Sequence, residues 1–180
     1  YAPVSELQEK YGSPNPKGLM EYISTCKREF KPQTKFQYSC LNYITLQHII
    51  ETITGQSLRD FAKENIFDIL GMQYTDYLPT IQQQDGKWIN TVACPWMDRI
   101  APTEKQKDGS VLCGQVHDPL ARILNGGISG NAGIFSNAND IGILAAALLN
   151  GGEYNGRRIL SPLGVKTMCT VPRELTAFGR

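Results

Sequence analysis

The sequence predicts a chain that is rich in α-helix and long irregular segments, with few strands. Three observations support this prediction: a strong helical pattern over residues 39–70, capped helices that follow Ser136 and Ser161, and a stretch over 73–120 that is broken by proline and glycine. The 180 residues are enough for one large domain or two small ones. Apolar residues make up 41% and charged residues 19% of the chain, a composition that favours a packed core over disorder.

The helical pattern begins at Ser39, a residue type that caps helix N-termini. Apolar side chains then recur at spacings of three and four residues, and Gly55 provides a stop signal. Ser57 begins a second helix, which has its own apolar face and ends at Gly71. The pattern therefore predicts a helical hairpin over 39–70.

The segments before and after this hairpin have weaker sequence patterns for secondary structure. Prolines and glycines predict a loop over residues 1–18, and a short amphipathic helix is expected over 19–30. The stretch 73–120 is predicted to be a long insertion or loop excursion, because it lacks a helical period. Residues 125–170 combine a glycine-rich turn with helices, and the last of these starts at the N-cap Ser161 with proline following it.

Composition excludes several kinds of partner. Lys and Arg together number 18 against 17 Asp and Glu, so a net charge of +1 gives no electrostatic basis for binding nucleic acid or an anionic membrane. No run of apolar residues is long enough to predict a membrane span. The five cysteines form no Cys-x-x-Cys and only two histidines accompany them, so neither a metal site nor a cofactor is expected. They are interpreted as reduced structural thiols, with a Cys94–Cys113 pair left open.

Two short motifs are weak. Ser24 and Lys27 match S-x-x-K, which on a helix would bring an amine beside a hydroxyl. Because the pattern fixes only two positions, chance produces it often, and the alternative is a solvent-facing serine and lysine. The glycine-rich segment 126–133 matches neither phosphate-loop pattern and misses the nucleophile elbow by one residue, so it is predicted to be a tight turn.

Two other positions carry side chains of types that take part in catalysis or substrate binding. Tyr38 precedes the N-terminus of the strongest predicted helix, where the positive end of the helix dipole favours a phenolate. The alternative is a core tyrosine with a solvated hydroxyl. His117 and Asp118 follow the long irregular stretch, and the histidine could orient a substrate. Alternatively Asp118 starts a turn before Pro119 and the histidine is packed.

Several phrases of the sequence resemble the serine β-lactamase-like family, which includes class C β-lactamases, penicillin-binding proteins and esterases. The first phrase matches the family's Tyr-centred second motif and comprises Phe36, Gln37, Tyr38, Ser39, Cys40, Leu41, Asn42 and Tyr43. Phrases that agree later in the chain cover residues 66–75, 99–104, 116–118, 126–140, 148–152 and 158–162. The resemblance spans residues 30–170 in the family's order.

The resemblance implies an α+β, β-lactamase/transpeptidase-like fold, in which a helical subdomain packs against a subdomain with an antiparallel sheet. This chain would be mainly the helical subdomain plus long irregular insertions, so that residues 1–180 form a partial domain. The family chemistry is acyl transfer. A serine attacks a carbonyl, backbone amides hold the oxyanion, and a tyrosine and a lysine move the proton.

The resemblance also assigns roles to residues. It makes Tyr38 the catalytic proton relay and places Cys40, His117 and Asp118 at the substrate. The chain departs from the family at Cys40, where Asn or Asp is usual, and at Asn131, where this branch commonly has His. A thiol cannot replace the hydrogen bonds of an amide, so Cys40 lacks the polar contacts that the family's Asn or Asp would make with substrate.

The other two family motifs are expected outside this chain. S-x-x-K should lie well upstream of the tyrosine, whereas Ser24 and Lys27 lie only 14 and 11 residues before Tyr38, so their match is treated as coincidence. The Lys/His-x-Gly motif should follow Arg180. We therefore expect a fragment of a β-lactamase-like serine hydrolase, inactive as an isolated chain. The alternative is a non-catalytic binding or scaffold module with the same fold.

The expected partner is a small-molecule or peptidoglycan-type substrate of the parent protein: a β-lactam, a peptide or an ester. A piece cut from a larger fold exposes apolar faces, so a homodimer of the isolated chain is also expected. The resemblance implies a bacterial protein of the periplasm or cell envelope.

Overall fold

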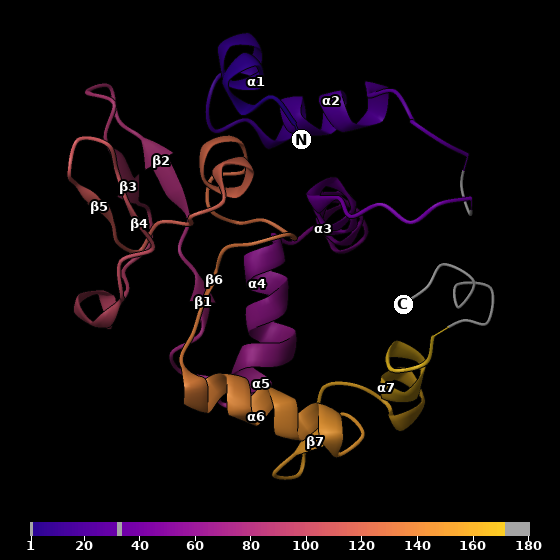
Figure 1. The fold of residues 1–180 in the computed structure, drawn as a ribbon. Coiled ribbons are helices and arrows are strands. Elements are labelled where there is room, and N and C mark those ends of the chain that lie inside the picture. The colour runs from indigo at the N-terminus through magenta and orange to yellow at the C-terminus, as the bar shows by residue number, and fades with distance from the viewer. Residues whose placement is uncertain (1, 32–33, 172–180) are drawn as a thin grey trace. The chain divides into compact units, whose positions relative to one another are not determined.

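The computed structural model describes residues 2–31 and 34–171, and Figure 1 shows the course of the chain. The chain divides into two compact units, each assembled from separate stretches of sequence. The first unit contains Tyr1–Cys26, Ser39–Phe61 and Asp76–Phe135, and the second contains Lys27–Tyr38, Ala62–Thr75 and Ser136–Arg180. Both units combine helices with short antiparallel strands, which confirms the α+β class.

Helices and short ribbons make up the first unit. Its helices are α1 (Val4–Tyr11), α2 (Pro16–Thr25), α3 (Cys40–Thr54), the start of α4 (Leu58–Ala62) and a π-helical turn at Leu120–Leu124. Its strands pair antiparallel as β1 (Asp76–Tyr77) with β6 (Ile134–Phe135), β2 (Thr80–Gln82) with β3 (Trp88–Asn90), and β4 (Glu104–Lys105) with β5 (Val111–Leu112). A 3₁₀ turn at Met97–Arg99 separates β3 from β4.

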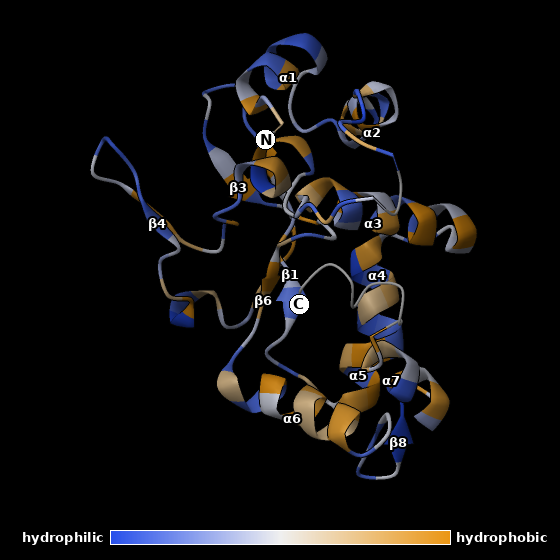
Figure 2. Cartoon of the chain, turned by 45° about the vertical axis from the view of Figure 1, so that its right-hand side comes forward, coloured by the Kyte–Doolittle hydropathy of each residue, from blue (hydrophilic) through white to orange (hydrophobic). Residues whose placement is uncertain are grey.

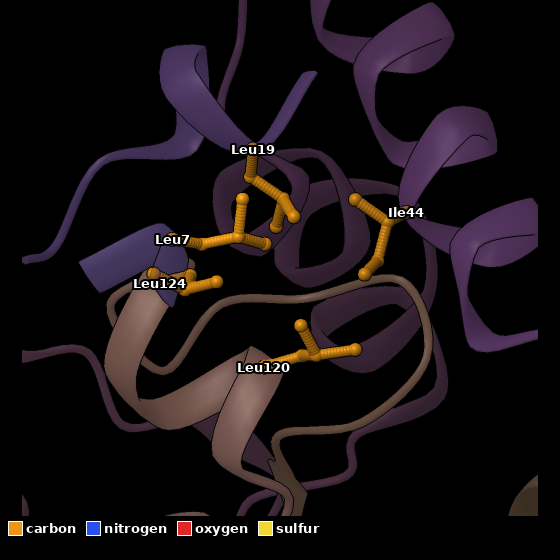
Figure 3. Close-up of a cluster of buried hydrophobic side chains, with 5 residues drawn as sticks. All are labelled: Leu7, Leu19, Ile44, Leu120 and Leu124. Atoms are coloured by element: carbon orange, nitrogen blue, oxygen red, sulfur yellow. The ribbon is translucent and has the colours of Figure 1, made fainter. Parts of the chain in front are cut away.

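The apolar core of the first unit lies between its helices, as Figure 3 shows. Five buried side chains meet there: Leu7 of α1, Leu19 of α2, Ile44 of α3, and Leu120 and Leu124 of the π-helical turn. Burial of such side chains stabilises a fold by about 1.5–3 kcal/mol each. The core therefore fixes α3 against the π-helical turn, although the two lie far apart in the sequence.

The predicted signals at both ends of α3 are confirmed. Ser39 Oγ accepts a hydrogen bond from the backbone N–H of Leu41 at 3.3 Å, and Gly55 ends the helix in the left-handed conformation with φ of 70°. The next helical segment runs through α4, a π-helical stretch at Lys63–Phe67 and α5 (Asp68–Leu70) to Gly71, with φ of 74°. How these helices pack on one another stays a prediction.

The prediction of a loop over residues 1–18 is wrong. Residues 4–11 form α1, and α2 starts at Pro16 because Asn15 Oδ1 accepts the N–H of Gly18 at 2.8 Å. Pro16 at the first helical position favours the helix rather than breaking it. Gly18 is required inside α2, because an added Cβ would lie 2.6 Å from Cγ of Tyr11.

The second unit centres on α6 (Ala138–Leu149), which Figure 2 shows as predominantly hydrophobic. Asn137, not the predicted Ser136, caps this helix, since Asn137 Oδ1 accepts the N–H of Asp140 at 2.8 Å. The buried Asp140 carboxylate in turn accepts hydrogen bonds from the backbone N–H of Tyr74 at 2.7 Å and the hydroxyl of Thr75 at 2.8 Å. This carboxylate therefore ties residues 74–75 to the start of α6.

The remaining elements of the second unit follow α6. A hairpin of β7 (Glu153–Tyr154) and β8 (Arg157–Arg158) leads to α7 (Pro162–Met168). Ser161 caps α7 as predicted, because its Oγ accepts the N–H of Gly164 at 3.0 Å.

Tyr77 of β1 is buried in the first unit and gives a test of the packing there. Burial, and secondarily the negative charge of Glu51, raises the pKa of Tyr77 to about 12. Because folding favours the neutral phenol, its contribution to stability is complete below pH 10 and is lost as the pH rises toward 12. We predict that Tyr77 steepens the alkaline loss of unfolding free energy by up to about 1.4 kcal/mol per pH unit.

Urea unfolding at stepped pH measures this effect. Tyr77→Phe should flatten the dependence of stability on pH between 10 and 12. Tyr43→Phe, at a side chain that is 54% exposed, should leave it unchanged. Equal slopes for wild type and Tyr77→Phe would contradict the assignment.

Candidate functional site

A cluster of buried polar contacts in the first unit lies where the glycine-rich segment 125–133 meets α3. At their centre is Gln47, which is 6% exposed. Gln47 Oε1 accepts hydrogen bonds from Asn125 Nδ2 at 2.8 Å and from the backbone N–H of Gly130 at 3.0 Å. Its Nε2 donates to the carbonyl of Ile128 at 3.2 Å and to Glu51 Oε1 at 3.1 Å. We call this set of contacts the Gln47 junction.

Two side chains extend the junction toward the surface of the segment. Asn125 Nδ2 also donates to Ser129 Oγ at 2.9 Å, and the Ser129 hydroxyl donates to Asn131 Oδ1 at 2.6 Å. Asn125 and Ser129 are buried, whereas Asn131 is half-buried. Buried polar groups that are all hydrogen-bonded to one another make an arrangement rigid and specific.

The segment approaches α3 so closely that only glycine fits. A Cβ added at Gly130 would lie 2.0 Å from the carbonyl oxygen of Tyr43, in the first half of α3. Gly127, with φ of 85°, lies against the backbone of residues 78–80, where an added Cβ would be 2.8 Å from the carbonyl oxygen of Leu78. The predicted tight turn is therefore a contact surface for α3 on one side and for the chain around β2 on the other.

The residues around the start of α3 lie in different environments. Tyr38 directly precedes the cap residue Ser39 and its side chain is 75% exposed, so it is not a core tyrosine. Cys40, the first residue of α3, is partly buried and packs against the apolar cluster of the first unit. An apolar contact of this kind suits a thiol, and any role of Cys40 toward substrate stays a prediction.

His117 and Asp118 lie at the start of the π-helical turn. Asp118 Oδ1 accepts the N–H of Ala121 at 2.9 Å, so the aspartate starts this turn, which is one half of the second sequence interpretation; its other half, a packed histidine, is wrong. The imidazole is 68% exposed and not packed, with Nδ1 3.4 Å from Glu104 Oε2. Asp118 thus fixes the turn, and His117 keeps an accessible imidazole.

Arg122 stabilises the backbone under His117. Its Nη1 donates to the carbonyls of Val116 at 2.6 Å and His117 at 2.9 Å, and it lies 3.8 Å from Glu104 Oε2. Burial lowers the pKa of Arg122, while Glu104 and Asp118 act in the opposite direction. The carboxylates thus offset part of the cost of burying this cation.

The S-x-x-K match does not form a dyad on a helix. Helix α2 ends at Thr25, and Cys26 is extended with ψ of 140°, so Lys27 lies beyond the helix. Ser24 Oγ donates to the carbonyl of Glu21 at 2.8 Å. The helical geometry that would bring the Lys27 amine to Ser24 is therefore absent, in keeping with the interpretation of the motif as coincidence.

The structure also bears on metals, thiols and membranes. None of the five cysteines forms a disulfide, so the Cys94–Cys113 pairing is not seen. Over residues 2–31 and 34–171, His, Cys, Asp and Glu side chains do not gather in groups of three that could hold a metal ion. In the same described ranges, no helix combines the length and apolar character of a membrane span.

Gln47, Asn125 and Ser129 were not among the site residues predicted from the sequence. A signal for Gln47 was present, since it lies three residues after Ile44 on the face of α3 that becomes buried. No comparable signal marked Asn125 or Ser129, because their partners lie on another segment of the chain.

Known proteins resemble this chain over most of its length. The sequence pattern of the family described as Beta-lactamase matches residues 2–176. An Escherichia coli protein named "Putative D-alanyl-D-alanine carboxypeptidase" is 34% identical over 172 residues, which cover 89% of this chain and 37% of the relative. A Salmonella agona protein of the same name is 30% identical, with 98% of this chain and 41% of the relative covered. The chain thus spans about two fifths of the length of these relatives.

Solved structures share the fold at low sequence identity. A D-stereospecific amidohydrolase from Streptomyces sp. aligns with a TM-score of 0.58 and 17% identity, covering 94% of this chain and 43% of that one. The octameric penicillin-binding protein homologue from Pyrococcus abyssi aligns with a TM-score of 0.55 and 19% identity, covering 96% and 33%. These matches confirm the β-lactamase/transpeptidase-like fold expected from the sequence.

The close approach of Gly130 to α3 predicts the cost of adding a methyl group there. Gly130→Ala should lower the free energy of unfolding by about 1–3 kcal/mol, because the contacted atom is a backbone carbonyl oxygen of a helix. Gly142→Ala is the matched control: no atom lies within 4 Å of the added Cβ in α6, and this variant should gain up to about 1 kcal/mol. Chemical denaturation measures both changes. Equal stabilities of the two variants would contradict the contact.

Proposed function

Because the chain belongs to the beta-lactamase family of serine hydrolases, we propose that it is part of an enzyme that hydrolyses its substrate through an acyl-serine intermediate. The nucleophilic serine attacks a carbonyl carbon, and the leaving amine or alcohol departs with a proton. Water then attacks the ester and releases the acid. The serine and its lysine base lie outside the matched phrases of this chain.

Tyr38 carries the part of this chemistry that the chain contributes. Tyr38 is exposed and directly precedes the capped N-terminus of α3, where the helix dipole favours negative charge. The exposed Tyr38 at the start of α3 is the observation that supports a proton-relay role most directly.

The proposed substrate is a peptide that ends in D-alanyl-D-alanine. The relatives that bear the carboxypeptidase name are about 30–34% identical to this chain, and one structural neighbour is an amidohydrolase. Such a substrate belongs to peptidoglycan, so we place the whole protein in the bacterial cell envelope. A β-lactam or an ester is the alternative acyl donor.

By itself the chain is proposed to be inactive. Its only S-x-x-K serine, Ser24, donates its hydroxyl to the carbonyl of Glu21 and is not paired with Lys27 on a helix. A second candidate function is a binding or scaffold module without catalysis. The partial burial of Cys40 in the apolar cluster, where the family has a polar residue, favours this alternative.

Covalent labelling tests the proposal. Incubation with a penicillin, and separately with a fluorophosphonate, should give one adduct on the full-length protein and none on residues 1–180 alone, as measured by intact mass. In the full-length protein, Tyr38→Phe should slow acylation by about 100-fold or more, because the relay hydroxyl is lost. Tyr43→Phe, one turn into α3, should acylate at the wild-type rate.

Several outcomes would contradict the proposal. An adduct on Ser24 of the isolated chain would make Ser24 the nucleophile. A full-length protein that is folded by circular dichroism but never labelled would favour the non-catalytic module. Equal acylation rates for Tyr38→Phe and Tyr43→Phe would remove Tyr38 from the mechanism.

A further inference from the structure

Asn131 lies at the tip of a turn that rests on α3. The turn runs from Ser129 to Ala132, whose N–H donates to the carbonyl of Ser129 at 3.2 Å. Within this turn, Gly130 lies against α3: its N–H donates to Gln47 Oε1 at 3.0 Å, and a Cβ added to it would lie 2.0 Å from the carbonyl oxygen of Tyr43. Asn131 therefore directly follows a residue that lies against the N-terminal half of α3, the helix that begins at Cys40.

The hydrogen bonds of the junction determine which way the Asn131 amide faces. A backbone N–H can only donate, so the bond from Gly130 fixes Gln47 Oε1 as an acceptor. Asn125 must then present its NH₂ group to Gln47, and it gives its second N–H to Ser129 Oγ. The Ser129 hydroxyl is thereby left to donate, and it donates to Asn131 Oδ1.

The amide nitrogen of Asn131 consequently faces away from the junction with two N–H donors. Within the described residues, Asn131 Nδ2 has no hydrogen-bond partner, although its oxygen is held at 2.6 Å. A turn alone does not require this arrangement, because Asn, Asp, Gly or Ser would serve in a turn. The buried relay from Gln47 through Asn125 and Ser129 instead holds one half-buried amide in one orientation.

We propose that Asn131 Nδ2 donates a hydrogen bond to an acceptor oxygen of the bound substrate, with Gln47, Asn125 and Ser129 acting as positioning residues. The inference rests on the proposed function, since it assigns a substrate contact for that site. A neutral, pre-oriented amide donor suits a carbonyl or a carboxylate oxygen. A peptide ending in D-alanyl-D-alanine offers both, and an amidated form of the same peptide offers carbonyls alone.

Steady-state kinetics of the full-length protein on an N-acetylated peptide ending in D-alanyl-D-alanine tests this contact. Asn131→Asp keeps the acceptor for Ser129 but replaces the donor by a carboxylate oxygen, so kcat/KM should fall by about 10- to 100-fold. Asn131→Ala should lower it by about 10-fold. Ser129→Ala, which frees the amide of Asn131 to rotate and also removes the acceptor of Asn125, should lower it by a smaller factor. Asn139→Asp, the same change at an exposed residue of α6, should leave kcat/KM within twofold of wild type.

The amidated peptide distinguishes the two acceptors. If Asn131 contacts the terminal carboxylate, Asn131→Asp loses more activity on the free acid than on the amide, whereas a carbonyl contact gives equal losses. Thermal unfolding midpoints distinguish a substrate contact from a structural role. A structural role would lower the midpoint of Asn131→Ala and leave kcat/KM unchanged. Wild-type turnover with Asn131 variants within twofold of it would overturn the contact and leave the proposed function standing. A folded wild-type protein without turnover or acylation would overturn both.

Discussion

The arrangement of the first unit depends on one buried amide, that of Gln47. Its oxygen and nitrogen both contact the glycine-rich segment, about 80 residues further along the chain, and the nitrogen also contacts Glu51 of its own helix. Glu51 Oε1 also accepts the N–H of Leu58 at 3.0 Å, so the same carboxylate holds the start of α4. A buried amide is costly unless all of its groups are paired, and these partners satisfy it.

The glycines and the apolar cluster follow from this constraint. Three hydrogen bonds between Gln47 and the segment require it to lie at contact distance from α3, and at Gly130 the backbone of Tyr43 leaves no room for a Cβ. Ile44, one turn before Gln47, anchors the same face of α3 in the apolar cluster of Figure 3. The apolar contact of Ile44 and the polar contacts of Gln47 thus lie one turn apart on the same face of α3. Together they position the segment that carries Asn131.

Sequence reasoning predicted the features that depend on neighbouring residues. Ser39, Gly55 and Ser161 act within one helical turn, so their residue types were sufficient. Helix α1 was missed because its stability comes from burying Leu7 against Leu124, a contact that no local pattern shows. The Gln47 junction was missed for the same reason, since the residues that pair there are 78 to 83 positions apart. The resemblance to a family located Tyr38, but it did not reveal the relay that orients Asn131.

A double-mutant cycle between Gln47 and Asn125 tests the junction most directly. Gln47→Met and Asn125→Leu remove the paired amides with little change in volume, and urea unfolding gives the free energy of each single and of the double variant. Each single change should cost about 1–3 kcal/mol, because it leaves a buried partner unsatisfied. The double variant should cost less than the sum of the two by about 1 kcal/mol or more. Single changes that cost little and add within about 0.3 kcal/mol would show that the amides act independently, and would contradict this account.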